Sequence, residues 1–241
     1  MIHWLAKIIF GRVLPRISYP VLCGPLRGAR FILGALAGDC GGASVYFNKV
    51  EPEQTETFVR AVKKGHVIFD IGANAGYYTV LSARLAGPQG RVIAFEPAVR
   101  NLAYLYRHVA LNKLTNVTLV PAACSQSVGL AFFSEGPNCA TGHLGAENDR
   151  QGAPVVTVSV DNVAQQLGLL PDIVKIDVEG AEMDVLQGMS NTLQKARPAI
   201  FLSVHSDALR DACLAYLKTF GYTPKGLDST HTDPKEFLLT A

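Results

Sequence analysis

The chain has 241 residues, which is the upper end of the size of one α/β domain. Hydrophobic residues make up 49% of it and charged residues 17%, a globular composition that excludes an intrinsically disordered chain. The formal net charge is +2 and no block of Lys and Arg occurs, so no nucleic-acid partner is expected. The five cysteines form no C-x-x-C pair, which disfavours zinc or disulfide scaffolding and favours a reducing, cytoplasmic compartment.

The N-terminal residues 1–52 are predicted to form an extension or cap. Nothing in residues 1–24 approaches the roughly 20 apolar residues of a membrane span. The apolar residues at helical spacing are Trp4, Leu5, Ile8 and Ile9. They predict a helix packed on the domain or on a partner subunit, which leaves a homo-oligomer open, and the less favoured alternative is an interfacial membrane helix. Residues 24–48 are rich in Gly and predict small strands and turns, so the extension could cover an acceptor pocket.

From Pro52 onward, helical and strand patterns alternate. A first helix is expected from Glu53 to Lys64, ended by Gly65. Buried strands are expected at 67–71, 91–95, 117–120, 173–176, 199–204 and 237–239, and helices at 76–85, 101–111, 160–167, 181–193 and 209–220. Residues 128–133 and 155–158 predict an antiparallel pair around a polar loop. This alternation predicts an α/β domain over residues 53–241 with a doubly wound sheet.

The stretch from Val67 to Thr79 carries the strongest chemical signal. A buried strand ends at Asp70, a loop with Gly72 and Gly76 follows, and a helix begins with uncapped amides that suit an anion. The Gly-x-x-x-Gly spacing disfavours a dinucleotide pyrophosphate site and therefore an oxidoreductase. An acid directly before the loop would repel a diphosphate and favours a ligand with an ammonium group. The alternative is an ordinary tight turn between strand and helix.

Two further features suit a nucleoside. Glu96 ends the next strand, where a carboxylate can accept hydrogen bonds from a ribose diol, and Pro97 fixes the backbone beside it. The alternative for Glu96 is a cap of the following helix. Ala122 follows the third strand, where a small side chain would let an adenine ring approach.

A later buried strand carries Lys175 and delivers Asp177 and Glu179 to the carboxyl edge of the sheet, where ligands of open α/β sheets bind. Together with Glu182, these carboxylates could bind a metal, orient a substrate or act as a base, and no metal ligand is assigned from the sequence. The alternative is an ion-paired helix start.

Taken in order, these motifs resemble the FkbM family of S-adenosylmethionine-dependent methyltransferases. The matching stretches are Phe69–Thr79, Ala94–Pro97 with Asn101, Leu111–Asn112, and Lys175–Glu182 with Leu186 and Gly188. The resemblance covers about residues 50–222 and implies a Rossmann-like class I methyltransferase fold with a mostly parallel seven-stranded sheet whose last strand is antiparallel. Ser203 stands where family members often carry Glu, two residues before His205, which leaves the acceptor contacts open.

The resemblance implies methyl transfer from S-adenosylmethionine, most often to a hydroxyl of a natural product or glycan. Alternatives are an N or C acceptor, or a non-catalytic nucleoside-binding subunit. His205 is expected to act as base or acceptor-orienter with Asp177 or Glu179 as partner, unless it is a hydrogen-bonded strand-end residue. The expected donor-binding residues are Asp70, Gly72, Ala73, Asn74, Gly76, Tyr77, Glu96, Pro97, Asn101, Ala122 and Asp177.

Overall fold

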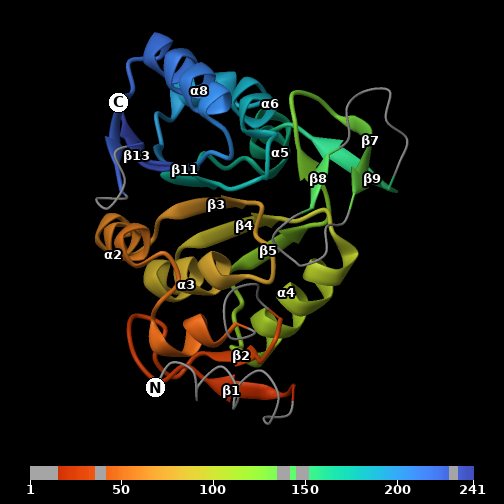
Figure 1. Ribbon diagram of the computed structural model, residues 1–241, viewed down its shortest axis with the longest axis vertical. Coiled ribbons are helices and arrows are strands. Elements are labelled where there is room, and N and C mark those ends of the chain that lie inside the picture. The colour runs from red at the N-terminus through yellow and green to blue at the C-terminus, as the bar shows by residue number, and fades with distance from the viewer. Residues whose placement is uncertain (1–15, 36–41, 135–141, 145–151, 228–232) are drawn as a thin grey trace.

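A seven-stranded sheet forms the centre of the protein (Figure 1). The computed structural model describes residues 16–35, 42–134, 142–144, 152–227 and 233–241. The strands of the sheet are β3 (Val67–Ile71), β4 (Arg91–Phe95), β5 (Val117–Val120), β10 (Ile173–Ile176), β11 (Ala199–Ser203), β12 (Thr223–Gly226) and β13 (Glu236–Thr240). Their spatial order is β12-β13-β11-β10-β3-β4-β5.

Strand directions confirm the predicted sheet. From β11 to β5 all neighbours are parallel, and β13 runs antiparallel to both β11 and β12. The bounds of β3, β4, β5 and β10 coincide with the predicted strands. In β3, β4 and β10 the reason is that residues buried on both faces of a parallel sheet form mostly apolar runs. Strand β12 was not predicted, since all four of its residues are exposed and it contains Pro224.

Helices cover both faces of the sheet (Figure 1), as expected of a doubly wound fold. They are α2 (Pro52–Ala61), α3 (Tyr77–Ala86), α4 (Val99–Leu111), α5 (Val160–Leu167), α6 (Glu182–Gln187), α7 (Ser190–Lys195) and α8 (Asp207–Thr219), with a 3-10 helix η2 (Ala43–Phe47). Helices α2, α3 and α4 lie on one side, and α5, α6 and α8 on the other. Each face of the sheet therefore has its own apolar core.

The prediction of one helix over 181–193 was wrong, because α6 and α7 are separate helices with a break at Gly188 and Met189. A Cβ at Gly188 would lie 2.1 Å from the carbonyl oxygen of Ser125. The chain of the neighbouring insertion therefore passes directly against this position. Helix α2 also ends at Ala61, three residues before the predicted Lys64.

A second, four-stranded sheet lies beside the carboxyl edge of the first. It consists of β6 (Ala123–Cys124), β7 (Gly129–Ser134), β8 (His143–Leu144) and β9 (Ala153–Val158) in the order β6-β9-β7-β8. Strands β7 and β9 are antiparallel, which confirms the predicted pair. Since β6 begins three residues after β5 ends, this sheet is joined directly to the main one.

The N-terminal segment packs against α3 and α4. Its strands β1 (Ser18–Pro20) and β2 (Arg30–Ile32) form an antiparallel pair, and Phe31 belongs to the same core cluster as Tyr77. The backbone amide of Ile32 donates to Nε2 of the buried His108 (2.9 Å). The helix predicted around Trp4 to Ile9 lies outside the described residues. Among the residues that are described, no helix is long and apolar enough to cross a membrane.

Candidate active site

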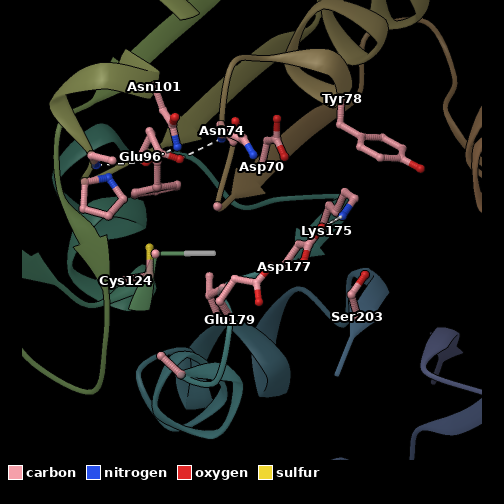
Figure 2. A pocket seen from close by; sticks show the side chains of 18 of the residues that line it. Asp70, Asn74, Tyr78, Glu96, Asn101, Cys124, Lys175, Asp177, Glu179 and Ser203 are labelled. Atoms are coloured by element: carbon pink, nitrogen blue, oxygen red, sulfur yellow. Dashed lines mark hydrogen bonds and ion pairs between the residues drawn. The ribbon is translucent and has the colours of Figure 1, made fainter. Parts of the chain in front are cut away.

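A cavity of about 390 Å³ opens at the carboxyl ends of β3, β4, β10 and β11 (Figure 2). Of the donor residues predicted from the sequence, those lining it are Asp70, Gly72, Ala73, Asn74, Tyr77, Glu96, Pro97, Asn101, Ala122 and Asp177. The three residues predicted to be catalytic, Asp177, Glu179 and His205, line the same cavity. The predicted site residues, except Gly76, therefore come together in one place.

The loop after β3 is held by backbone hydrogen bonds to the end of β4. Gly72 has φ 80°, and a Cβ there would lie 1.9 Å from the carbonyl oxygen of Asp177, so only glycine fits. The amides of Gly72 and Ala73 both donate to the carbonyl of Phe95 (3.1 and 2.9 Å). The loop is thus bonded to the end of β4 and packed against the end of β10, and no side chain caps the helix α3 that follows.

Gly76 is placed differently from the prediction. It does not line the cavity, and a Cβ on it would lie 2.5 Å from Cδ1 of Leu105 in α4. Its φ of 95° also belongs to the left-handed region. Gly76 therefore serves the turn into α3 and the packing of α4 against it.

Glu96 is 4% exposed at the tip of β4. Its Oε2 accepts from the amide of Asn74 (2.7 Å), and its Oε1 accepts from the amide of Ala98 (2.9 Å) and from Nδ2 of Asn101 (3.3 Å). Burial raises the pKa of Glu96, although the bonds from Ala98, Asn74 and Asn101 oppose the rise. A carboxylate offers about four acceptor positions, so capacity is left for a ligand hydroxyl.

Asp70 is 2% exposed at the tip of β3. Its Oδ2 accepts from the hydroxyl of Thr79 (2.5 Å). Burial raises the pKa of Asp70 to about 6, against the lowering effects of Thr79 and Lys175. The carboxyl group is therefore ionised at pH 7, and a cationic ligand group beside it would be attracted.

One side of the cavity is apolar. Ala122, Ala123 and Cys124 are each 5% exposed or less, and Phe133 of the insertion lines the same wall. Cys124 lies opposite Asp70 and Asp177 in Figure 2. The small side chains of this wall leave room for a flat heterocycle.

On another side of the cavity, the buried ammonium group of Lys175 lies near the carboxylates of Asp177, Glu51 and Asp70. Lys175 is 2% exposed, donates to Oδ2 of Asp177 (3.0 Å) and lies 4.6 Å from the ring centroid of Tyr78. Burial alone lowers the pKa of Lys175, but the carboxylates of Asp177, Glu51 and Asp70 outweigh it and raise the pKa above its ordinary value. The ammonium group thus stays charged and holds these acids near one another.

Glu51 is a site residue that the sequence did not reveal. Its carboxylate accepts from the hydroxyl of Tyr78 (2.9 Å) and from Nε2 of Gln54 (2.7 Å), and it lines the cavity. Its backbone has φ 38°, an uncommon value for a residue with a side chain. Asn74 and Glu179, both at φ 52°, also line the cavity, so strained backbone is concentrated here.

His205 lies among three carboxylates. Its Nδ1 is 2.6 Å from Oε1 of the fully buried Glu182, and its Nε2 is 3.6 Å from Oδ1 of Asp177 and 3.4 Å from Oε2 of Glu179. Interaction with Glu179 and then Glu182 raises the pKa of His205 to about 10, against the effect of burial. These carboxylates favour a protonated ring at pH 7, which differs from the neutral base expected from the sequence.

Ser203 lines the cavity and is 8% exposed. Its partner across the antiparallel ladder is Glu236 of β13, which lines the cavity together with Lys235. Directly opposite residues of an antiparallel pair have neighbouring side chains on one face. A carboxylate therefore reaches this part of the cavity from the neighbouring strand, although the sequence has Ser at position 203.

Solved structures define the class of fold. Methyltransferase FkbM from Methylobacillus flagellatus KT superposes with a TM-score of 0.54 at 16% identity, covering 86% of this chain and 56% of that one. Fibrillarin from Aeropyrum pernix, solved with natively bound S-adenosyl-L-methionine, gives a TM-score of 0.50 at 14% identity, covering 75% of this chain and 68% of that one. The chain therefore has the Rossmann-like fold of methyltransferases, as predicted.

A family model described as the methyltransferase FkbM domain matches residues 70–224. The protein belongs to this family, and the match contains the tips of β3, β4, β10 and β11 that form the cavity.

Curated relatives have a higher sequence identity to this chain than these solved structures do. Methyltransferase 1 of Beauveria bassiana is 29% identical over 146 residues, covering 52% of this chain and 58% of the relative. The hexuronic acid methyltransferase AglP of Haloferax volcanii is 26% identical over 159 residues, covering 65% of this chain and 63% of the relative. The chain thus matches about three fifths of the length of these relatives.

Proposed function

We propose that the protein transfers a methyl group from S-adenosylmethionine to a hydroxyl oxygen of a small natural product or a sugar. The observation that carries this proposal is the pair of buried carboxylates, Asp70 and Glu96, at two adjacent strand tips of one cavity of about 390 Å³. That volume is within the range of about 300 to 1,000 Å³ that ligand pockets occupy.

The cavity offers complementary groups for each part of the donor. Asp70 is ionised at neutral pH and attracts the α-ammonium group. Glu96, already oriented by Asn74 and Asn101, accepts from the ribose diol. The apolar wall around Ala122 and Phe133 receives the adenine. These contacts agree with membership of a methyltransferase family.

Acceptor chemistry is assigned to the side of the cavity around Asp177, Glu179 and His205. When bound, S-adenosylmethionine supplies a sulfonium methyl group, so an O–CH₃ bond forms while the S–CH₃ electron pair returns to sulfur. The acceptor hydroxyl must lose its proton during this exchange. Because His205 is protonated in this arrangement, it orients Asp177 and Glu179, and one of these carboxylates takes the proton.

The sugar class of acceptor is supported by one relative, the hexuronic acid methyltransferase of Haloferax volcanii. The cavity wall beyond His205 carries Lys235 and Glu236, groups that can bind the hydroxyls or a carboxylate of a sugar. Positioning and exclusion of water supply much of the rate of such a displacement, so these contacts align the hydroxyl with the methyl group.

Calorimetry with adenosylhomocysteine tests the donor site. The protein should bind adenosylhomocysteine but not NAD, and Asp70→Asn and Glu96→Gln should each weaken binding by about 10-fold or more, as expected when a hydrogen bond to a charged group is lost. The matched control is Glu56→Gln, which alters an exposed carboxylate of α2 paired with Arg60. Wild-type affinity in both cavity variants would refute this placement of the donor.

A second assay addresses the reaction. Incubation with donor and a panel of hydroxylated acceptors should give one product heavier by one methylene group, identified by mass spectrometry. If only amine or carbon acceptors gave methylated products, the proposed hydroxyl acceptor would be wrong and an N or C acceptor would take its place. Donor binding without any methylated product across the panel would favour a non-catalytic nucleoside-binding subunit.

A further inference from the structure

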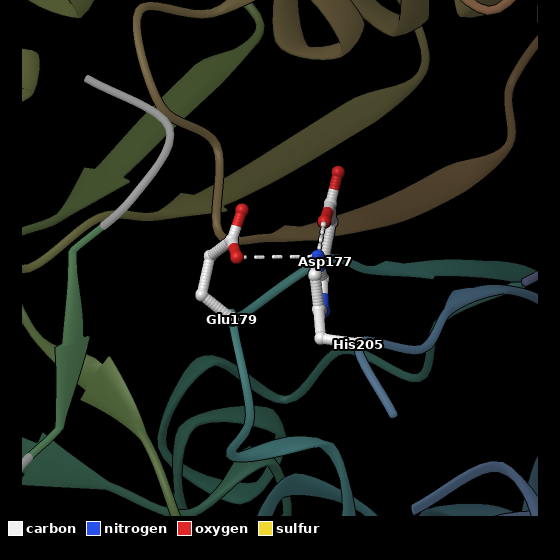
Figure 3. A group of neighbouring side chains, drawn as sticks. All are labelled: Asp177, Glu179 and His205. Carbon is white, nitrogen blue, oxygen red and sulfur yellow. Dashed lines mark ion pairs between the residues drawn. The ribbon is translucent and has the colours of Figure 1, made fainter. Parts of the chain in front are cut away.

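The acceptor side of the cavity contains a cluster of three potential metal ligands. Asp177 and Glu179 follow β10, and His205 follows β11, so the ends of two adjacent strands converge there (Figure 3). Nε2 of His205 lies 3.6 Å from Oδ1 of Asp177 and 3.4 Å from Oε2 of Glu179. One ligand atom from each of the three residues lies within 4.8 Å of the other two.

The geometry points to a binding site for one divalent transition-metal ion, held by Asp177, Glu179 and Nε2 of His205. Such ions hold N and O ligands at about 2.0 to 2.2 Å, so adjacent ligands of a tetrahedral or octahedral ion lie about 3.0 to 3.5 Å apart. The separation of 3.4 Å from Nε2 of His205 to Glu179 already lies in this range, and that of 3.6 Å to Asp177 is just above it, while the third pair lies within 4.8 Å. One imidazole with two carboxylates suits Mn²⁺ or Zn²⁺ better than Mg²⁺ or Ca²⁺, which take oxygen ligands.

A second observation concerns the other nitrogen of the ring. Glu182 is 0% exposed, and its Oε1 is 2.6 Å from Nδ1 of His205 and also accepts from the amide of Gly180 (3.0 Å). When Nδ1–H donates to Glu182, the lone pair of Nε2 points at Asp177 and Glu179. A buried carboxylate that orients a histidine in this manner is typical of metal sites, where it fixes the tautomer.

The charge of the cluster also favours a divalent ion. Asp177, Glu179 and Glu182 bring three carboxylates, and within the described part of the chain the ammonium group bonded to them is that of Lys175. Oε2 of Glu182 is buried and finds no hydrogen-bond donor among the described residues. Around a neutral imidazole the cluster therefore has an excess of two negative charges, which one divalent cation balances.

The site faces the cavity. The side chains of Asp177, Glu179 and His205 are 29%, 34% and 31% exposed, and all three line the cavity wall. The remaining positions of the ion are thus open to a hydroxyl oxygen of the acceptor, which the ion would hold and acidify. This role rests on the proposed function, whereas binding of the ion depends only on the side chains.

The test measures Mn²⁺ binding to metal-free protein by electron paramagnetic resonance, in the absence of donor. Mn²⁺ is the probe because the exposed thiol of Cys23 would compete for Zn²⁺. Wild-type protein should bind about one ion per chain. His205→Ala should abolish binding, Glu182→Gln should weaken it about 10- to 100-fold by removing the orienting carboxylate, and the control Glu56→Gln should leave it unchanged.

Adenosylhomocysteine affinity and melting temperature are measured on every variant, so that folding and the donor site are followed separately. A cluster variant that loses Mn²⁺ but binds adenosylhomocysteine normally supports the metal site. No Mn²⁺ binding by well-folded wild-type protein overturns it, and so does unchanged affinity in Glu182→Gln, the variant that keeps all three ligands. Loss of adenosylhomocysteine binding with Mn²⁺ binding intact would count against the proposed function alone.

Discussion

Ionisation of Asp70 has a cost in stability that substitution should reveal. Its pKa is raised from an ordinary 3.8 to about 6, mainly by burial, so the folded state holds this proton more tightly than the unfolded state. Below pH 3.8 both states are protonated and no cost arises. Between the two values the cost grows with pH, and above pH 6 it levels off at about 3 kcal/mol, since each pKa unit corresponds to about 1.4 kcal/mol.

Asp70→Asn removes this cost and keeps an oxygen that can accept from Thr79. At pH 7.5 the variant should therefore be more stable than wild type by up to about 3 kcal/mol, and at pH 4.5 by only about 1 kcal/mol. Urea denaturation at the two pH values measures both differences, with Glu56→Gln as an exposed control. An advantage that does not shrink at pH 4.5, or a loss of stability at pH 7.5, would refute the reasoning.

The same substitution should have the opposite effect on the donor site. If Asp70 attracts the ammonium group, wild-type affinity for adenosylhomocysteine should fall by about tenfold per pH unit below pH 6, because the protonated carboxyl no longer pairs with a cation. Asp70→Asn should show weak affinity with no such dependence. Calorimetry from pH 5 to 7.5 distinguishes the two behaviours, and a flat wild-type profile would exclude Asp70 as the ammonium partner.

Two further substitutions test how the cavity is held together. Gly72→Ala places a Cβ 1.9 Å from the carbonyl of Asp177 at φ 80°, whereas Gly168→Ala meets no atom within 4 Å at φ 64°. Denaturation should show a loss of about 1 kcal/mol for Gly168→Ala, from backbone strain alone, and a clearly larger loss for Gly72→Ala. Lys175→Met leaves Asp177 without its buried cation and should lower the free energy of unfolding by about 3 to 5 kcal/mol. A loss below about 1 kcal/mol would contradict a charged Lys175.

Local sequence patterns predict those parts of the site that depend on strand ends. Asp70, Glu96 and Asp177 each follow a mostly apolar run, and parallel strands bring such ends to one edge of the sheet. The helix break at Gly188 could not be predicted in this way. The backbone of Ser125, more than 60 positions earlier in the sequence, leaves room only for glycine there, a contact that no periodicity encodes.

The contributions of Glu51 and Glu236 were missed for the same kind of reason. An acid directly before a helix, such as Glu51, would be expected in solvent from the sequence alone. In the structure the hydroxyl of Tyr78 donates to its carboxylate at the cavity wall. Glu236 reaches the cavity because β13 pairs antiparallel with β11 and places it opposite Ser203. Both positions depend on contacts between segments distant in the sequence: Glu51 on the packing of α3, and Glu236 on the order of the strands.

The protonation of His205 shows most clearly how such long-range contacts change the chemistry. Its position at a strand end suggests a neutral base, since an isolated imidazole titrates near pH 6.5. Glu179 and Glu182, brought close by the turn after β10, raise the pKa to about 10 and make the ring a cation in the absence of metal. The same carboxylates that disfavour a neutral base would help to hold a divalent ion, because an ion replaces the ring proton as the positive partner. The residue types at 177, 179 and 205 therefore do not decide between a protonated orienting residue and a metal ligand, and the Mn²⁺ titration decides it directly.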